Sequence, residues 1–446
     1  MNTIQPSTRR LAQVVTTLVV ALGLLAHASQ NPPQQPTFRA SVDLVAVEVQ
    51  VVDSDGRPVT TLDRDKFEVT IDGRQRKVVS SDLIQAAGAP LGSTRPAPTG
   101  PVATNNWPTA APSDHSYIVA FDASSFEAGE AVPVLAAARN FVDRLPEGDL
   151  VGVFTLSHFG PRMDPTTNRP VIRRALETAT GQRHATAGQF NLSTSEIIDI
   201  MANPGTLSQV SSAPVSSAAT ARATAVVPMT TETDTLGRVQ ARECRRANDL
   251  GCREAIVSEA GALAQNLEER VRLTLNGLTE LLDALRRYPG RKTVVVLSTG
   301  MAISDRPGGR IDIGTEASLL GEQAARANAT IYALHIDNGV SQSFSAESRR
   351  ARDSASLSRE RTLESKLLDE FASTTGGALL SVSVGSGEVA LDRVLRETSA
   401  YYLLGVEPAG IDRDGKAHRL RVKVNQRGAT IRSRQWVMLP RVATTR

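Results

Sequence analysis

The feature of the sequence that most constrains its fold is an apolar run that ends abruptly in acidic and hydroxyl groups. Residues 117–121 are apolar, and Asp122 with two serines follows them within four positions. From residue 127 to residue 145, apolar side chains recur at helical spacing. Short apolar runs are typical of buried parallel strands, and open α/β sheets bind ligands at the carboxyl ends of such strands. The stretch predicts a strand–helix unit with a candidate site at its junction.

The same alternation continues along the chain. Further apolar runs predict strands at residues 149–156, 293–297, 330–335, 378–384 and 400–404. Helical periodicity predicts helices at residues 171–178, 254–287, 314–327, 361–374 and 389–399. Strands that alternate with helices in this way favour a parallel sheet covered by helices on both faces. We expect an α/β fold with a doubly wound, mostly parallel, Rossmann-like sheet.

Segments on either side of this region have a different pattern. Residues 38–85 alternate with a period of two and contain an Asp-Gly turn, which predicts a small N-terminal all-β module. Residues 86–113 have the composition of a linker, and the α/β domain then spans residues 114–408. It contains an insertion at about 180–260, with helical character near residues 195–201. Residues 409–446 predict C-terminal β strands and a tail.

The N-terminus has the features of an export signal. Arg9 and Arg10 precede an apolar run that extends to Ala26, and Ala26-His27-Ala28 provides small residues for cleavage. We expect residues 1–28 to be a signal peptide and residues 29–37 a disordered, Pro-rich spacer. The chain would then be periplasmic or extracellular. The alternative is an uncleaved anchor, which would be its sole contact with a membrane.

The composition argues against a nucleic-acid partner. The formal net charge is +3, and it falls to about +1 once residues 1–28 are removed, because Arg9 and Arg10 leave and no acidic residue does. Aromatic residues make up only 4% of the 446 residues, which argues against a stacking platform for single-stranded nucleic acid. We expect a protein partner and no nucleic acid.

Cys244 and Cys252 are the only cysteines of the chain. In an exported protein a close pair favours a local disulfide, which would hold the turn before the long helix. Two free thiols are the alternative. Two cysteines without other soft ligands do not make a zinc site.

Four segments carry a resemblance to a known family: residues 117–125, residues 149–155, residues 290–300 and the Thr-Gly-Gly of residues 375–377. In this order and spacing they resemble a von Willebrand factor A (VWFA) domain. The ensemble is more closely similar to VWFA-related proteins of the acidobacterial type. In those proteins an exported chain carries a short β segment before the domain and a Tyr-Tyr-Leu-Leu-Gly run after it, here residues 67–73 and 401–405. The resemblance covers about residues 38–437, apart from the insertion.

The resemblance implies a metal-ion-dependent adhesion site. In the family, an Asp-x-Ser-x-Ser loop, a threonine and a further aspartate hold a divalent cation such as Mg²⁺, with one position free for a partner's carboxylate. Asp122 and Ser124 match the first two loop positions. Phe126 stands where the third position has serine, although Ser125 is adjacent. Thr166 matches the threonine.

This sequence departs from the family's ligand set in other ways. Thr167 is a rival to Thr166 for the threonine position. The second aspartate has no counterpart, because residues 298–300 offer only hydroxyl groups and Asp305 lies five positions beyond Gly300. Fewer charged ligands weaken a cation site. Both a working cation site and a degenerate loop kept for the fold therefore remain open.

Three functional classes follow from these expectations. The first is an exported, non-catalytic VWFA-like module for protein–protein interaction or adhesion, with or without a divalent cation. The second is a metal-independent structural or envelope-assembly scaffold. An enzyme such as a hydrolase comes third, because no nucleophile–base pair or acid pair can be assembled from the sequence. We expect no enzymatic activity.

Overall fold

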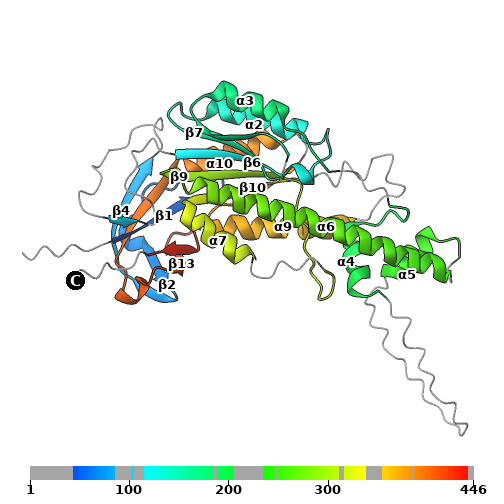
Figure 1. Ribbon diagram of the computed structural model, residues 1–446. Coiled ribbons are helices and arrows are strands. Elements are labelled where there is room, and N and C mark those ends of the chain that lie inside the picture. Colours follow the sequence, from blue (N-terminus) through cyan, green and yellow to red (C-terminus); the bar gives the residue numbers. More distant parts are fainter. Residues whose placement is uncertain are drawn as a thin grey trace, which may run out of the picture. The chain divides into compact units, whose positions relative to one another are not determined.

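The computed structural model describes residues 44–85, 102–104, 115–157, 159–183, 188–204, 235–246, 249–310, 316–337, 354–383 and 385–439 (Figure 1). All of them belong to one compact unit of the chain, Asp43–Arg446. The expected signal peptide, the spacer and most of the expected linker lie outside the described residues. Among the helices of the described ranges, none is long and apolar enough to cross a membrane.

The centre of the unit is a six-stranded sheet with the strand order β11-β10-β9-β6-β7-β8. All neighbouring strands are parallel except β7 and β8. The bounds are β6 His115–Phe121, β7 Leu150–Thr155, β8 Arg162–Thr166, β9 Arg291–Ser298, β10 Ala329–Asp337 and β11 Leu379–Ser383. The predicted α/β class with a mostly parallel sheet is therefore confirmed.

Helices cover both faces of this sheet. Successive strand residues point to opposite faces, and apolar side chains on each face pack against helices. On β6, Tyr117, Val119 and Phe121 pack with α2 (Val132–Arg144), α3 (Arg169–Thr178) and α10 (Gly387–Thr398). Ile118 and Ala120 pack with α6 (Leu250–Leu285), α7 (Glu316–Ala327) and α9 (Ser354–Thr375). Figure 1 shows the two helical layers on opposite sides of the strands. Each layer encloses its own apolar core.

Two antiparallel sheets join the N-terminal and C-terminal segments of the unit. One has the strand order β14-β1-β12-β4, with β5 paired in parallel to β1, and the other has the order β15-β13-β2-β3. Their apolar residues form one shared core. The bounds are β1 Leu44–Val52, β2 Phe67–Ile71, β3 Arg74–Arg76, β4 Val78–Gln85, β5 Val102–Thr104, β12 Ala400–Val406, β13 Ala417–Val424, β14 Thr430–Ser433 and β15 Trp436–Met438.

Strand β12 lies in these antiparallel sheets, although the sequence analysis assigned residues 400–404 to the α/β domain. It pairs with β1 on one side and β4 on the other. The side chain of Tyr402 explains this location. Its ring lies 5.1 Å from the ring of Phe67, and its hydroxyl donates to the carbonyl of Val59 and accepts from the backbone of Leu62. The Tyr-Tyr-Leu-Leu-Gly run is thus a central strand of the antiparallel core.

The segment after β7 also differs from the expectation. A helix was expected at residues 171–178 with no strand before it, but the chain first returns as β8, antiparallel to β7. Helix α3 then begins at Arg169, and the side chain of Asn168 accepts a hydrogen bond from the backbone of Val171. Asn168 is therefore the N-cap of this helix.

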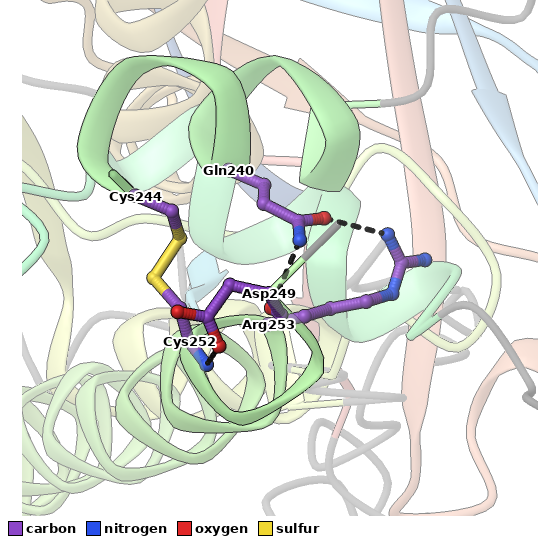
Figure 2. The surroundings of a disulfide bond; sticks show 5 residues. All are labelled: Gln240, Cys244, Asp249, Cys252 and Arg253. Atoms are coloured by element: carbon purple, nitrogen blue, oxygen red, sulfur yellow. Dashed lines mark hydrogen bonds between the residues drawn. A yellow bond between two sulfur atoms is a disulfide. The ribbon is translucent and has the colours of Figure 1, made fainter. Parts of the chain in front are cut away.

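The described residues of the insertion form a small helical subcluster against the first part of α6. Helix α4 (Thr194–Ala202) matches the expected helical stretch, whereas α5 (Thr235–Glu243) was not predicted. Cys244 and Cys252 form a disulfide between the end of α5 and the first turn of α6, with their Cα atoms 6.1 Å apart. Figure 2 shows the surrounding contacts, in which Gln240 donates to the carbonyl of Asp249 and accepts from Arg253.

Candidate functional site

The candidate site lies where the order of the parallel strands changes direction. Strand β6 has β7 on one side and β9 on the other, so that the chain winds away from β6 in both directions. Open α/β sheets bind ligands at this switch point, outside the carboxyl ends of the strands. Asp122 follows β6 directly, and Ser298 is the last residue of β9. The two predicted strand ends therefore meet at the crevice.

Hydroxyl groups from three elements converge on the carboxylate of Asp122. Ser124 and Thr274 donate to Oδ1 at 2.7 and 3.0 Å, and Ser298 donates to Oδ2 at 2.7 Å. Asp122 is only 1% exposed. Burial raises the pKa of Asp122, whereas the three hydroxyl groups and the positive charge of Arg270 lower it. The hydrogen bonds show how a buried carboxylate is accommodated here.

Ser125 has a different role from Ser124. Its hydroxyl donates to the carbonyl of Asp122 at 2.8 Å and accepts from the backbone of Thr299 at 3.0 Å. The hydroxyl of Thr299 donates in turn to the carbonyl of Ser125. Ser125 therefore ties the loop after β6 to the loop after β9. Phe126, at the position where the family has serine, is fully buried and stacks on Phe121 with ring centroids 5.3 Å apart.

Thr166 does not lie with Asp122 and Ser124. It pairs with Val151 on β7, and Val151 is level with Tyr117 on β6. Tyr117 precedes Asp122 by five positions, which corresponds to about 16 Å along a strand. Thr166 and its neighbour Thr167 are therefore near the amino end of the sheet, because the antiparallel return of β8 carries them there. The hydroxyl of Thr166 accepts instead from the backbone of Asn168.

The threonine hydroxyl beside Asp122 belongs to Thr274 and not to Thr166. Thr274 lies within α6, and the carbonyl of Arg270 one turn earlier, 3.1 Å away, is an alternative acceptor for the single proton of its hydroxyl. It is 2% exposed. Nothing local in the sequence distinguishes it, because a threonine inside a long amphipathic helix is an ordinary residue. Only the packing of α6 against the loop after β6 shows its role.

Several charged groups surround the crevice. Arg183 pairs with Glu127 and Glu130. Arg270 lies close enough to Asp122 and Glu364 for both to raise its pKa, although burial and the charge of Arg183 lower it more. Burial raises the pKa of Glu364 to about 7, and repulsion from Glu360 adds to the effect. The crevice thus contains a carboxyl group that titrates near neutrality.

Glu364 makes the stability of the fold depend on pH. Its pKa is higher in the folded chain than its ordinary value of 4.5, so the folded chain holds the proton more tightly between pH 4.5 and about 7. The contribution of Glu364 to stability is therefore present at low pH and is lost as pH rises through this window. As pH rises from 4.5 to above 7, we expect the free energy of unfolding of Glu364→Gln to increase by about 2–3 kcal/mol relative to that of wild type. Urea unfolding of both proteins across this range measures the difference.

The matched control is Glu370→Gln, which removes an exposed carboxylate from the same helix. Its stability relative to wild type should stay constant over the same range of pH. If the difference between Glu364→Gln and wild type is also constant, Glu364 does not titrate in this window.

A groove opens at the same edge of the sheet, beyond the ends of β10 and β11. Its volume is about 170 Å³, and it lies between the amino-terminal ends of α2 and α10. The residues that line it are mostly apolar or small, with a carboxylate at each side: Glu130, Pro133, Val134, Ala136, Ala137, Ile336, Val382, Ser383, Gly385, Gly387 and Glu388. Val132 and Val389, next in sequence to lining residues, are 62% and 67% exposed. The carboxyl end of the sheet therefore combines a polar crevice with an apolar groove.

The oxygen atoms around Asp122 fit a hard divalent cation in their chemistry. One carboxylate and the hydroxyl groups of Ser124, Thr274 and Ser298 are the ligand types that Mg²⁺ and Ca²⁺ prefer. The charge is low, because Asp122 is the one carboxylate of this set and Arg270 lies nearby. Among the described residues, no group of three or more His, Cys, Asp and Glu side chains could hold a metal ion. A cation here would depend on hydroxyl ligands.

Comparison with protein-family models and with curated protein sequences finds no match for this chain.

Proposed function

We propose that this chain is an exported, non-catalytic interaction protein of the VWFA type, which binds a protein partner at the carboxyl end of its parallel sheet. The observation that carries the proposal is the convergence of Asp122 and three hydroxyl groups at the switch point of the sheet. Ligands of open α/β sheets bind at such switch points. The likeness in motif order to VWFA domains points to the same location.

The apolar groove favours a protein, and not a small molecule, as the partner that binds at this end of the sheet. Exposed valines are unfavourable in water, and a partner that covers Val132 and Val389 would remove them from it. Interfaces commonly combine an apolar centre with a polar rim. Glu388 lines the groove and would favour a partner with a basic group, whereas the charge of Glu130 is already balanced by Arg183.

In this proposal Asp122, Ser124, Thr274 and Ser298 hold a divalent cation. When bound, the cation would offer an open coordination position to a carboxylate of the partner. The protein groups orient the site, because each hydroxyl is fixed by a hydrogen bond to Asp122. A low charge count predicts weak cation binding.

A metal-independent scaffold is the second candidate, and a specific observation favours it. The three hydroxyl groups already satisfy the carboxylate of Asp122, and Arg270 supplies a positive charge beside it. Arg270 could then take a partner's carboxylate without a cation. The test below distinguishes the two candidates.

The disulfide supports an extracytoplasmic location. Disulfides persist in oxidising compartments and are rare in the reducing cytosol. Cys244 and Cys252 are bonded to each other. We propose that the chain is exported to the periplasm or beyond, as its N-terminal sequence pattern also predicts.

Site-specific photo-crosslinking in cells that produce the protein tests the function. A photoreactive amino acid at Val389 should yield a discrete protein adduct, because Val389 borders the proposed binding surface. The same amino acid at Ile411, which is 62% exposed in the antiparallel part, is the control and should yield none. Asp122→Asn should abolish the adduct at Val389. Equal labelling at both positions, or an adduct insensitive to Asp122→Asn, would contradict the proposal.

The same experiment in the presence of EDTA separates the two candidates. Loss of the adduct would support the cation-dependent module, and calorimetric titration of Mg²⁺ should then show binding to wild type and none to Asp122→Asn. An adduct that survives EDTA would support the metal-independent scaffold.

A further inference from the structure

A small polar cavity lies where the antiparallel strands pack against the parallel sheet. Its volume is about 10 Å³, which is enough for one water-sized particle. Its walls come from β1, β9, β10 and β14 and from two adjoining turns: Glu48, Gln50, Arg291, Thr330, Gly376, Arg432, Ser433 and Arg434. The cavity therefore lies at a junction of two sheets, away from the crevice around Asp122.

Buried nitrogen donors of Gln50 and Arg291, which both line this cavity, have no hydrogen-bond partner. Gln50 is 2% exposed, and its Oε1 accepts a hydrogen bond from the hydroxyl of Tyr332 at 2.8 Å. This bond fixes the orientation of the carboxamide and leaves its Nε2 without an acceptor. Arg291 is 8% exposed, and its Nη1 also lacks an acceptor. Unsatisfied buried donors are costly, so their presence at one cavity indicates an acceptor within it.

Positive charge exceeds negative charge around the cavity. Glu48 is the carboxylate shared by Arg291 and Arg434, at 3.5 and 3.6 Å. Arg432 is already paired with the buried Glu397 at 2.6 Å. The neighbouring Lys292 is 2% exposed, and burial followed by repulsion from Arg434 lowers its pKa to about 8. Among the described residues that line the cavity, one glutamate is thus shared by two arginines, and a small anion would add negative charge there.

We propose that this cavity binds a single chloride ion, held by the Nη1 group of Arg291 and the Nε2 group of Gln50. Chloride accepts hydrogen bonds from several N–H donors and carries the sign of charge that the junction lacks. It is slightly larger than water, so its binding would require a small displacement of the side chains that line the cavity. Larger anions such as phosphate are excluded by the size of the cavity. Binding would join the antiparallel sheet to the parallel sheet, because the two donors come from β1 and β9.

Thermal unfolding of the full chain in chloride and in gluconate, at equal ionic strength, tests the proposal. Gluconate is too large for the cavity, so site-specific binding should raise stability in chloride alone, and the variants below separate this from the general effects of the two anions. We expect the midpoint of unfolding to rise by about 2–4 °C in chloride. Equal midpoints in the two salts would overturn the proposal and leave an ordered water in the cavity.

The variant Gln50→Glu separates chloride binding from a general effect of salt. It preserves the oxygen that accepts from Tyr332 and places a carboxylate where chloride would bind. The fold should be retained, and the dependence on chloride should disappear. Gln426→Glu, which makes the same change at an exposed turn, should keep the dependence of wild type. If Gln50→Glu responds to chloride as wild type does, the ion binds elsewhere and the proposal fails.

Crystals soaked in bromide provide a direct measurement. An anomalous peak between Arg291 and Gln50 is expected for wild type, and its absence there would count against the site.

Discussion

Gly277→Ala is expected to destabilise the fold by about 2–4 kcal/mol. Gly277 lies in α6 where the helix approaches the end of β7. A Cβ atom at this position would lie 2.0 Å from the carbonyl oxygen of Leu156 and 2.7 Å from its Cα atom. Both are backbone atoms, so no side-chain rotation can relieve the overlap. The helix would have to move away from the sheet, which would open the core beneath it.

Gly261→Ala is the matched control for this prediction. Gly261 lies on the same helix, and nothing lies within 4 Å of the position that its Cβ atom would take. Alanine has the higher helix propensity, so this variant should gain about 0.5–1 kcal/mol. Urea unfolding monitored by circular dichroism measures both changes. Effects of the same sign for the two glycines would show that helix propensity, and not the close approach of α6, determines the outcome.

The close approach at Gly277 also bears on the candidate site. Thr274 lies three residues earlier on α6, and residues at this spacing share a face of a helix. Its hydroxyl reaches Asp122 at 3.0 Å because α6 packs closely on the end of the sheet. In Gly277→Ala that hydrogen bond should lengthen or break. Asp122 would then lose one of the donors that compensate its burial.

The local patterns of the sequence predicted the elements that form the parallel sheet. The run at residues 117–121 is part of β6, and Asp122 lies at its carboxyl end as expected. Such predictions succeed because a strand buried on both faces must be apolar throughout, and its polar end is visible in the sequence. The same reasoning placed Ser298 at the end of β9.

The pairing of distant segments was not predictable in the same way. The antiparallel return of β8 places Thr166 at the far end of the sheet, and no local pattern distinguishes that return from a loop. Strand β12 is apolar and follows a helix, as the parallel strands do, yet it pairs with β1 and β4. Thr274 became visible only through the packing of α6. The candidate site was thus predicted where it depends on strand ends and missed where it depends on tertiary contacts.

Glu397→Gln is expected to cost about 3–5 kcal/mol, because it breaks an ion pair whose carboxylate is fully buried. Glu397 on α10 is 0% exposed. Its carboxylate accepts from Nε and Nη2 of Arg432 on β14 at 2.6 and 3.2 Å, and from Nε of Arg393 at 2.8 Å. A carboxamide removes the charge and leaves Arg432 with an uncompensated charge at the junction of the sheets. Chemical denaturation monitored by fluorescence and circular dichroism measures the loss.

Two further variants decide whether the loss comes from the buried charge. Glu269→Gln breaks the exposed pair with Arg272, whose side chains are 57% and 67% exposed, and should cost less than about 0.5 kcal/mol. The double variant Glu397→Gln with Arg432→Met removes both partners of the buried pair. It should be more stable than Glu397→Gln alone, because an uncompensated charge costs more than the pair contributes. If the double variant loses the sum of the losses of Glu397→Gln and of Arg432→Met, each measured alone, the partners act independently. The link between α10 and β14 would then depend on their separate packing and not on the ion pair.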